Sequence, residues 1–110
     1  MKEEELKAYL SGVFDVRGFI KLRLKKYQYA IFFNFTKNEL EVWKKIKEIM
    51  DLFTIAKIYK SKKRIKEYQL YIGNKKNIKN FLAAILPYSI RKNEILMMLK
   101  VIERKKTKNL

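Results

Sequence analysis

The chain contains no cysteine and no histidine, and only one proline and three glycines among its 110 residues. Without cysteine there is no disulfide framework and no thiolate nucleophile, and without histidine the commonest general base and metal ligand are missing. A Ser-His-Asp triad, a Cys-His pair and a histidine-bound zinc are therefore excluded. Any hydrolytic chemistry would need carboxylates that hold an oxygen-preferring divalent ion.

Acidic residues are also few, because 11 Asp and Glu stand against 27 Lys and Arg and give a formal net charge of +16. Hydrophobic residues make up 48% and aromatic residues 14%, which is typical of a chain that folds around a core. The charge excess needs an anionic partner, and nucleic acid is favoured over a membrane surface or an acidic protein. The alternative is a lysine-rich surface as in thermophile proteins, but such ion-pair networks need nearly as many acids as bases.

Long hydrophobic runs are absent too. No stretch reaches the roughly 18–20 apolar residues of a membrane-spanning helix, and residues 1–6 are acidic where a signal peptide is basic. We therefore expect a soluble, cytoplasmic protein that does not bind membranes. The length predicts one domain over residues 1–110, with a frayed basic tail at about 104–110.

Hydrophobic periodicity predicts an α+β fold in the order α-β-β-α-β-β-α-α. Helices are expected over residues 2–16, 39–51 (capped by Asn38), 77–86 (stopped by Pro87) and 92–105, and strands over 19–26, 28–36, 54–60 and 65–72. The apolar stripes of the helices, which include Val42 and Leu96, should pack on the sheet. Two hairpins then form a four-stranded antiparallel sheet with the helices on one face.

The strand residues that point away from the predicted core are polar, basic and aromatic. Arg and Lys suit guanine edges, Asn and Gln suit adenine, and Thr, Phe and Tyr suit thymine methyl groups or backbone oxygens. A solvated sheet face would explain the lysines but not the neighbouring Phe19 and Phe32. We therefore predict a nucleic-acid-binding face formed by Phe19, Lys21, Arg23, Lys25, Gln28, Phe32, Asn34, Thr36, Lys57, Tyr59, Gln69 and Tyr71, with Lys62, Lys63 and Arg64 from a basic turn.

The end of the first predicted helix reads Leu10-Ser11-Gly12-Val13-Phe14-Asp15-Val16-Arg17-Gly18. This helix is apolar nearly all round, and small residues at Ala8 and Gly12 would let another helix approach. We predict an isologous homodimer contact through Ala8, Ser11, Gly12, Asp15 and Val16. Packing of Gly12 on its own sheet is the alternative.

The same nine residues resemble the motif of the LAGLIDADG homing endonucleases, with Leu10, Gly12, Asp15 and Gly18 as identical matches. The run from Ile85 to Lys92 also resembles the proline-aromatic segment that precedes the last long helix in the single-motif members of that family. The resemblance covers about residues 5–103. It implies a saddle-shaped sheet that lies along the major groove of double-stranded DNA, and a homodimer formed by the motif helices.

The resemblance further implies a Mg²⁺ ion held by the eighth residue of the motif, which here is Arg17. A cation at this position cannot hold Mg²⁺. Asp15 is the remaining candidate for a catalytic acid, although in the family its position helps to cap and pack the helix end. Lys92 matches the family's active-site basic residue, and Lys37 stands where a polar, water-organising residue is usual. Both are expected to contact phosphates even without cleavage.

These features favour a sequence-selective, homodimeric DNA-binding protein without nuclease activity, in which Arg17 contacts central phosphates or the minor groove. One alternative is an active endonuclease that uses Asp15, or a heterodimer whose partner supplies the acid, and only then is Mg²⁺ expected. Another is an RNA-binding, maturase-like splicing factor whose aromatic side chains stack on unpaired bases.

Overall fold

The helices and strands follow the predicted order and form an α+β fold. The computed structural model describes residues 2–26 and 28–103, so the predicted basic tail at 104–110 lies outside the described residues. The elements are α1 (Glu3–Arg17), β1 (Gly18–Arg23), β2 (Gln28–Thr36), α2 (Leu40–Met50), β3 (Lys57–Lys60), β4 (Glu67–Gly73), α3 (Lys75–Ile85) and α4 (Lys92–Glu103), with 3₁₀ turns at Leu24–Lys26 and Lys37–Glu39.

The strands form one antiparallel sheet in the order β1-β2-β4-β3. Along β2, the side chains of Ile31, Phe33 and Phe35 are buried against the helices, and in β4 Leu70 and Ile72 are buried on the same face. The alternation of apolar and polar residues therefore predicted the core face of these strands correctly.

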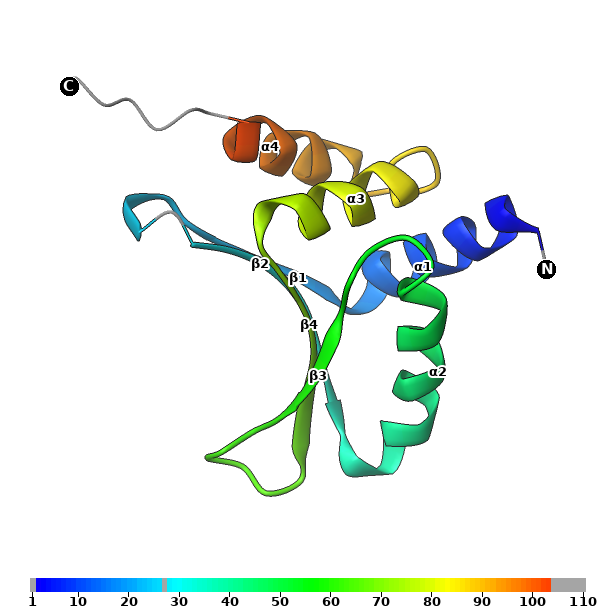
Figure 1. The fold of residues 1–110 in the computed structure, drawn as a ribbon, viewed down its shortest axis with the longest axis vertical. Helices are drawn as coiled ribbons and strands as arrows, with labels where there is room; N and C mark the ends of the chain where they lie inside the picture. Colours follow the sequence, from blue (N-terminus) through cyan, green and yellow to red (C-terminus); the bar gives the residue numbers. More distant parts are fainter. Residues whose placement is uncertain (1, 27, 104–110) are drawn as a thin grey trace.

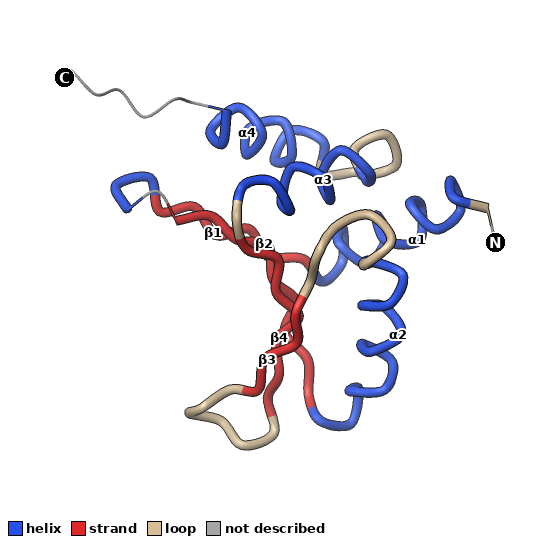
Figure 2. Tube along the Cα trace, viewed as in Figure 1, coloured by secondary structure: helices blue, strands red, loops and turns tan. Residues whose placement is uncertain are grey.

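The helices cover only this apolar face of the sheet (Figures 1 and 2). Phe81 of α3 lies at the centre of the core, with its ring 6.1 Å from that of Phe14 in α1 and 6.2 Å from that of Phe33 in β2. α4 packs against α3 (Figure 1). No helix in the described ranges is long and apolar enough to cross a bilayer.

α1 passes directly into β1, which brings the end of the motif helix to the first residue of the sheet. A Cβ atom on Gly18 would lie 2.4 Å from Cδ1 of Phe14, so a glycine is needed at this junction. The junction places Arg17 and Phe19, its two neighbours, at the corner where helix and sheet meet.

Two strand predictions were too long. β1 ends at Arg23, and Lys25 lies in the 3₁₀ turn that follows rather than on the strand. β3 begins at Lys57 because the chain before it is held against the helices. There the Thr54 hydroxyl donates to the carbonyl of Asn77 (2.6 Å), and the amide of Ala56 donates to the Asp51 carboxylate (3.2 Å).

Two helix predictions also need correction. Thr36, not Asn38, precedes the turn that leads into α2, and its amide donates to the Glu39 carboxylate at 3.3 Å. Val42 and Leu96, expected in the core, are 58% and 51% exposed, since each helix turns a narrower apolar stripe inward than its sequence suggested.

Candidate nucleic-acid interface

The predicted polar residues of the strands form one continuous surface, called the open face from here on. The strand register arranges them in rows across the sheet. In order along β2, the rows are Arg23 with Gln28; Lys21 with Ala30 and Gly73; Phe19 with Phe32, Tyr71 and Lys57; Asn34 with Gln69 and Tyr59; and Thr36 with Glu67. Residues from all four strands therefore meet on one surface, as the sequence predicted.

The middle row of the open face is aromatic. The rings of Phe19 and Phe32 stack with their centroids 5.3 Å apart and an interplanar angle of 14°, and Phe19 is 52% exposed. Tyr71 is paired with Phe32 in the register and meets Tyr59 edge-on at 5.8 Å. Aromatic surface thus crosses the sheet in the middle of a polar face.

The next row carries two amide side chains that are joined to each other. Nε2 of Gln69 donates to Oδ1 of Asn34 at 3.0 Å. This bond uses one donor and one acceptor of the pair, so amide N–H and C=O groups remain for a base edge. The bond also holds both side chains in a defined orientation.

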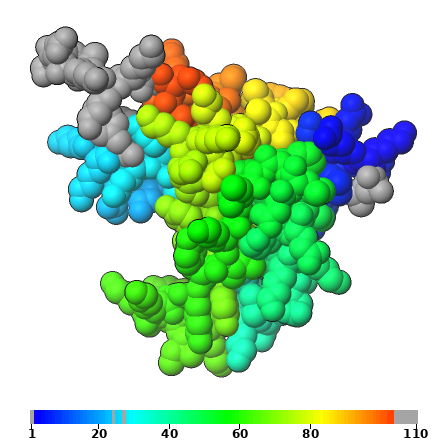
Figure 3. Space-filling view, in the orientation of Figure 1, coloured from blue at the N-terminus to red at the C-terminus, as the bar shows by residue number. Residues whose placement is uncertain are grey.

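Charge is distributed unevenly between the hairpins and the helices. Residues 18–36 and 57–73, which make up the two hairpins, contain ten Lys and Arg but a single acid, Glu67, which pairs with Arg64 at 3.3 Å. The other ten acidic residues lie in helices or directly at helix ends. The hairpins project on one side of the molecule with a hollow between them (Figure 3), so this side carries the positive field.

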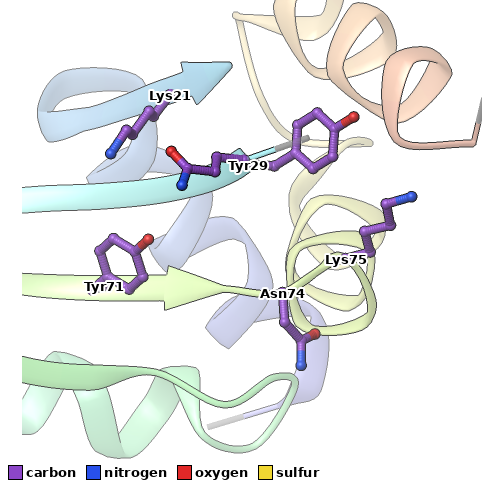
Figure 4. Close-up of a pocket in the computed structure, with 6 residues that line it drawn as sticks. Lys21, Tyr29, Tyr71, Asn74 and Lys75 are labelled. Carbon is purple, nitrogen blue, oxygen red and sulfur yellow. The ribbon is translucent and has the colours of Figure 1, made fainter. Parts of the chain in front are cut away.

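A hollow of about 310 Å³ lies at one end of the open face, where β4 leads into α3 (Figure 4). Three of its lining residues, Lys21, Gln28 and Tyr71, belong to the predicted face, and the other three are Tyr29, Asn74 and Lys75. Tyr29, Asn74 and Lys75 were not predicted. Nζ of Lys75 lies 5.7 Å from the centre of the Tyr29 ring. The sequence signal for Lys75 was its position directly after the Gly73-Asn74 break, since the next helix begins beside the strand end.

The basic turn and the remaining predicted lysines are exposed at the edges of the open face. Lys62, Lys63 and Arg64 lie in the loop between β3 and β4, where the Ser61 hydroxyl accepts from the amides of Lys63 and Arg64. Lys37 is exposed in the 3₁₀ turn after β2. These exposed cations add positive charge along the edges of the open face.

The Arg17 side chain is bound by residues of its own chain. Its guanidinium donates to the carbonyl of Asn34 at 2.8 Å, lies 3.4 Å from the Glu39 carboxylate and stacks over the Trp43 ring at 5.3 Å. Hydrogen bonds from Arg17 and from the Thr36 amide hold the pKa of Glu39 below its ordinary value of 4.5. Arg17 therefore joins the end of α1 to β2 and to the start of α2.

Asp15 and Arg91 join the same helix end to the segment before α4. The Asp15 carboxylate accepts from the hydroxyl of Ser89 and from the amide of Ile90. Nη1 of Arg91 donates to the carbonyls of Phe14 (2.9 Å) and Gly18 (2.7 Å), and its guanidinium stacks on the Phe14 ring at 4.4 Å. Because the Phe14 carbonyl also accepts from the Gly18 amide, Arg91 adds a second donor at the end of α1 and joins it to the start of β1.

The contacts of Arg91 differ from those of its neighbour Lys92, which the sequence had selected. Nζ of Lys92 donates to the carbonyl of Pro87 at 3.1 Å, and the side chain is exposed. The hydrogen bond and the charge of Arg91 hold the pKa of Glu94 below its ordinary value. Sequence reasoning missed Arg91 because two adjacent basic residues follow Ile90, and only the packed structure distinguishes them.

Most of the chain matches the sequence pattern of a known protein family. Residues 6–93 match the sequence model of the WhiA LAGLIDADG-like domain. The chain belongs to this family. The LAGLIDADG resemblance of its motif is therefore confirmed. None of the curated proteins compared with the chain matches it.

Solved structures share the LAGLIDADG fold at low sequence identity. The homing endonuclease I-CvuI in complex with its target has a TM-score of 0.74 and 17% identity over 92% of this chain and 68% of its own. The archaeal intron-encoded I-Vdi141I complexed with DNA has 0.64 and 19%, over 92% and 69%. The LAGLIDADG meganuclease I-CpaMI bound to uncleaved DNA has 0.68 and 16%, over 88% of this chain but only 37% of its own. These likenesses establish the fold.

The LAGLIDADG fold raises the question of a magnesium site at the end of α1, and the residues present do not fit one. Mg²⁺ takes near-octahedral oxygen coordination, with one or two carboxylates as the usual protein ligands. The eighth motif residue is the cation Arg17, and both oxygens of Asp15 already accept hydrogen bonds. Within residues 2–26 and 28–103 no group of three acidic side chains comes together. The residues at the end of α1 therefore do not support metal-dependent hydrolysis.

The LAGLIDADG helix α1 presents a different surface from the one predicted. Ala8, Gly12 and Val16 are exposed, Val16 to 80%, and a Cβ atom on Gly12 would meet nothing within 4 Å. Ser11 is 1% exposed and faces the interior of its own protomer, because each residue turns about 100° around a helix. Asp15 is held by hydrogen bonds to Ser89 and Ile90. The outward stripe of α1 therefore consists of Ala8, Gly12 and Val16.

Proposed function

We propose that this LAGLIDADG-like domain binds double-stranded DNA sequence-selectively as a homodimer, with its open face along the major groove and without cutting the DNA. The observation that carries the proposal is the separation of charge, since ten cations and one acid lie in the two hairpins and the other acids lie in or beside helices. A phosphate backbone is the anion that such an extended surface suits.

The side chains of the open face support base recognition in addition to phosphate contact. The major groove is about 12 Å wide and admits a two-stranded β-ribbon, and the sheet offers two such ribbons. Arg23 and Lys21 suit guanine, and the Asn34–Gln69 pair suits adenine. Gln28, Thr36, Lys57, Tyr59 and Tyr71 remain proposed contacts of the same face. Lys25, in the turn after β1, and Lys37, Lys62, Lys63, Arg64 and Lys92 are proposed phosphate contacts.

Binding without cleavage is supported by the chemistry at the end of α1. Arg17 stands where a metal-binding acid would be needed, and its guanidinium is tied to Glu39. A proposed contact of Arg17 with DNA would have to compete with that ion pair. The test is incubation of supercoiled DNA with the pure protein over a Mg²⁺ series. We expect no nicking, whereas nicking that disappears in D15N would establish the endonuclease alternative.

The homodimer is supported by the outward stripe of α1. With open space beside Gly12, a second copy of the helix can approach closely there, and a twofold contact would set two open faces in line. The test is G12K, which enlarges the stripe without any clash in the protomer. We expect a monomer whose fold is no less stable, because lysine favours a helix more than glycine does. Its DNA affinity should fall by roughly 100-fold or more, since avidity is lost. The matched control is A83K, at an exposed alanine of α3.

DNA binding itself is tested by selection from a random duplex pool, followed by salt titration. We expect a palindromic consensus and an affinity that falls steeply with salt. R23A should cost about 1–3 kcal/mol at particular base pairs, whereas K62A should weaken all sequences alike. If R23A and K62A lost the same affinity on every sequence, the open face would not recognise bases.

A second candidate function is RNA binding, and the aromatic row is the specific observation in its favour. Exposed rings on a sheet can stack on unpaired bases. Competition between the selected duplex and a structured RNA of equal length separates the two. We expect the duplex to compete better, and stronger competition by the RNA would favour the maturase-like alternative.

A further inference from the structure

The stacked pair of Phe19 and Phe32 is an apolar site in the middle of a polar surface. Phe19 is 52% exposed, and its neighbours along the sheet are the Lys21 row on one side and the Asn34–Gln69 row on the other. The rings lie 5.3 Å apart and nearly parallel, so they present one apolar patch rather than two separate side chains. Half of the Phe19 surface thus contributes nothing to the core of the protomer.

The edges of the bases in the major groove differ in how well they suit such a patch. Guanine, adenine and cytosine present hydrogen-bond donors and acceptors there, and thymine alone presents an apolar group, its C5-methyl. Covering a donor or acceptor with a phenyl ring removes its water without replacing the hydrogen bond, which is costly. Covering a methyl group removes apolar surface from water, which is favourable.

We propose that the Phe19–Phe32 pair reads the C5-methyl group of a thymine in each half of the DNA target. This inference rests on the proposed binding of duplex DNA by the open face. The register also orders the contacts, because the aromatic row lies between the Arg23 and Lys21 side and the Asn34–Gln69 pair. The thymine therefore lies between the base pairs read by those two groups. Adjacent rows are roughly 6.6–6.8 Å apart, or about two base-pair steps along a strand.

The experiment removes the methyl group from the DNA and the ring from the protein, separately and together. The probe is the duplex selected from the random pool, with deoxyuridine replacing thymidine at one position at a time. At one thymine of each half-site, the wild-type protein should lose about fourfold in affinity, which corresponds to one buried methyl group. F19A should bind the thymine duplex more weakly and should no longer distinguish deoxyuridine. F19L, which keeps an apolar contact, should still distinguish it.

The design separates failure of this inference from failure of the proposed function. The DNA substitution leaves the protein unchanged, so a loss of folding cannot imitate its effect. Y88A, at an exposed aromatic residue away from the strands, is the control variant and should keep full sensitivity to deoxyuridine. If no duplex is selected, duplex binding itself fails. If a duplex is selected but no single deoxyuridine weakens binding, or F19A keeps the same sensitivity as wild type, methyl recognition by this pair is overturned.

Discussion

The two faces of the sheet are built by the same strands but are held by different partners. On β2, Phe33 is fully buried beneath the helices, while its neighbour Phe32 lies on the open face against Phe19. The helix-covered face meets three elements of its own chain, α1, α2 and α3. None of these helices covers the open face, and only the start of α3 reaches its edge, where Lys75 lines the hollow. One face can therefore set the stability of the fold while the other is suited to a partner.

Charge follows the same division. The helices hold nearly all of the acids, and these balance lysines and arginines locally in ion pairs such as Lys47 with Asp51 and Arg91 with Glu94. In the hairpins one acid faces ten cations. Ten cations less one acid give the hairpins a net charge of +9, so they carry more than half of the chain's excess of +16.

The largest expected difference between the faces is in stability. F33A should lower the free energy of unfolding by about 3–5 kcal/mol, since it removes a buried ring from the core. F19A should lower it by less than about 1 kcal/mol, because half of that ring is already exposed. Urea denaturation of both variants measures this. Equal losses would mean that the open face also holds the fold together.

A smaller loss is expected where the two faces meet at the end of α1. R91A removes the bonds to the carbonyls of Phe14 and Gly18 and should cost about 2–3 kcal/mol. K92A, at the adjacent exposed lysine, should cost less than about 0.5 kcal/mol. Thermal denaturation compares the stability of the two variants. A larger loss for K92A than for R91A would mean that Lys92, not Arg91, stabilises the end of α1.

The hollow at the end of β4 tests how far the DNA-binding surface extends towards α3. If Lys75 meets a phosphate, K75Q should reduce the slope of log affinity against log salt by about 2 for the proposed homodimer, since each copy loses one contact. K76Q, which removes the same charge one residue further along α3 but outside that hollow, should leave the slope unchanged. Salt titrations of DNA binding for the two variants provide the measurement. Equal slopes would mean that Lys75 contacts no phosphate and that the DNA-binding surface does not include the start of α3.

The smallest effect concerns the ion pair of Arg17 with Glu39. Because the pKa of Glu39 is lower in the folded protein, its stabilisation is complete above the ordinary value of 4.5 and is lost as the pH falls through the folded-state value. The amount should be below about 1 kcal/mol, since both side chains are about two-fifths exposed. Urea midpoints of wild type and E39Q, compared from neutral pH to about pH 3, should converge at the acidic end. A constant difference would exclude this ion pair.

Much of the open face could be predicted because a strand alternates its side chains with a period of two. Phe19, Lys21 and Arg23 had to share one face of β1, and Asn34 had to lie opposite Ile31, Phe33 and Phe35 on β2. Helix faces were harder, because a difference of one residue moves a side chain by about 100°. Ser11 and Val42 were placed on the wrong sides for this reason.

The amino-acid sequence by itself determined the order of the elements, the polarity of the sheet faces and the charge excess, since these depend on residues close together in the chain. Only the tertiary structure decided that Arg17 meets Glu39 and Trp43, that Asp15 is taken by the Ser89 segment and that Arg91 rather than Lys92 closes α1. These partners are 22 to 77 positions apart. Local periodicity gives the side of an element on which a residue lies, but which residues of distant elements meet depends on how the elements pack.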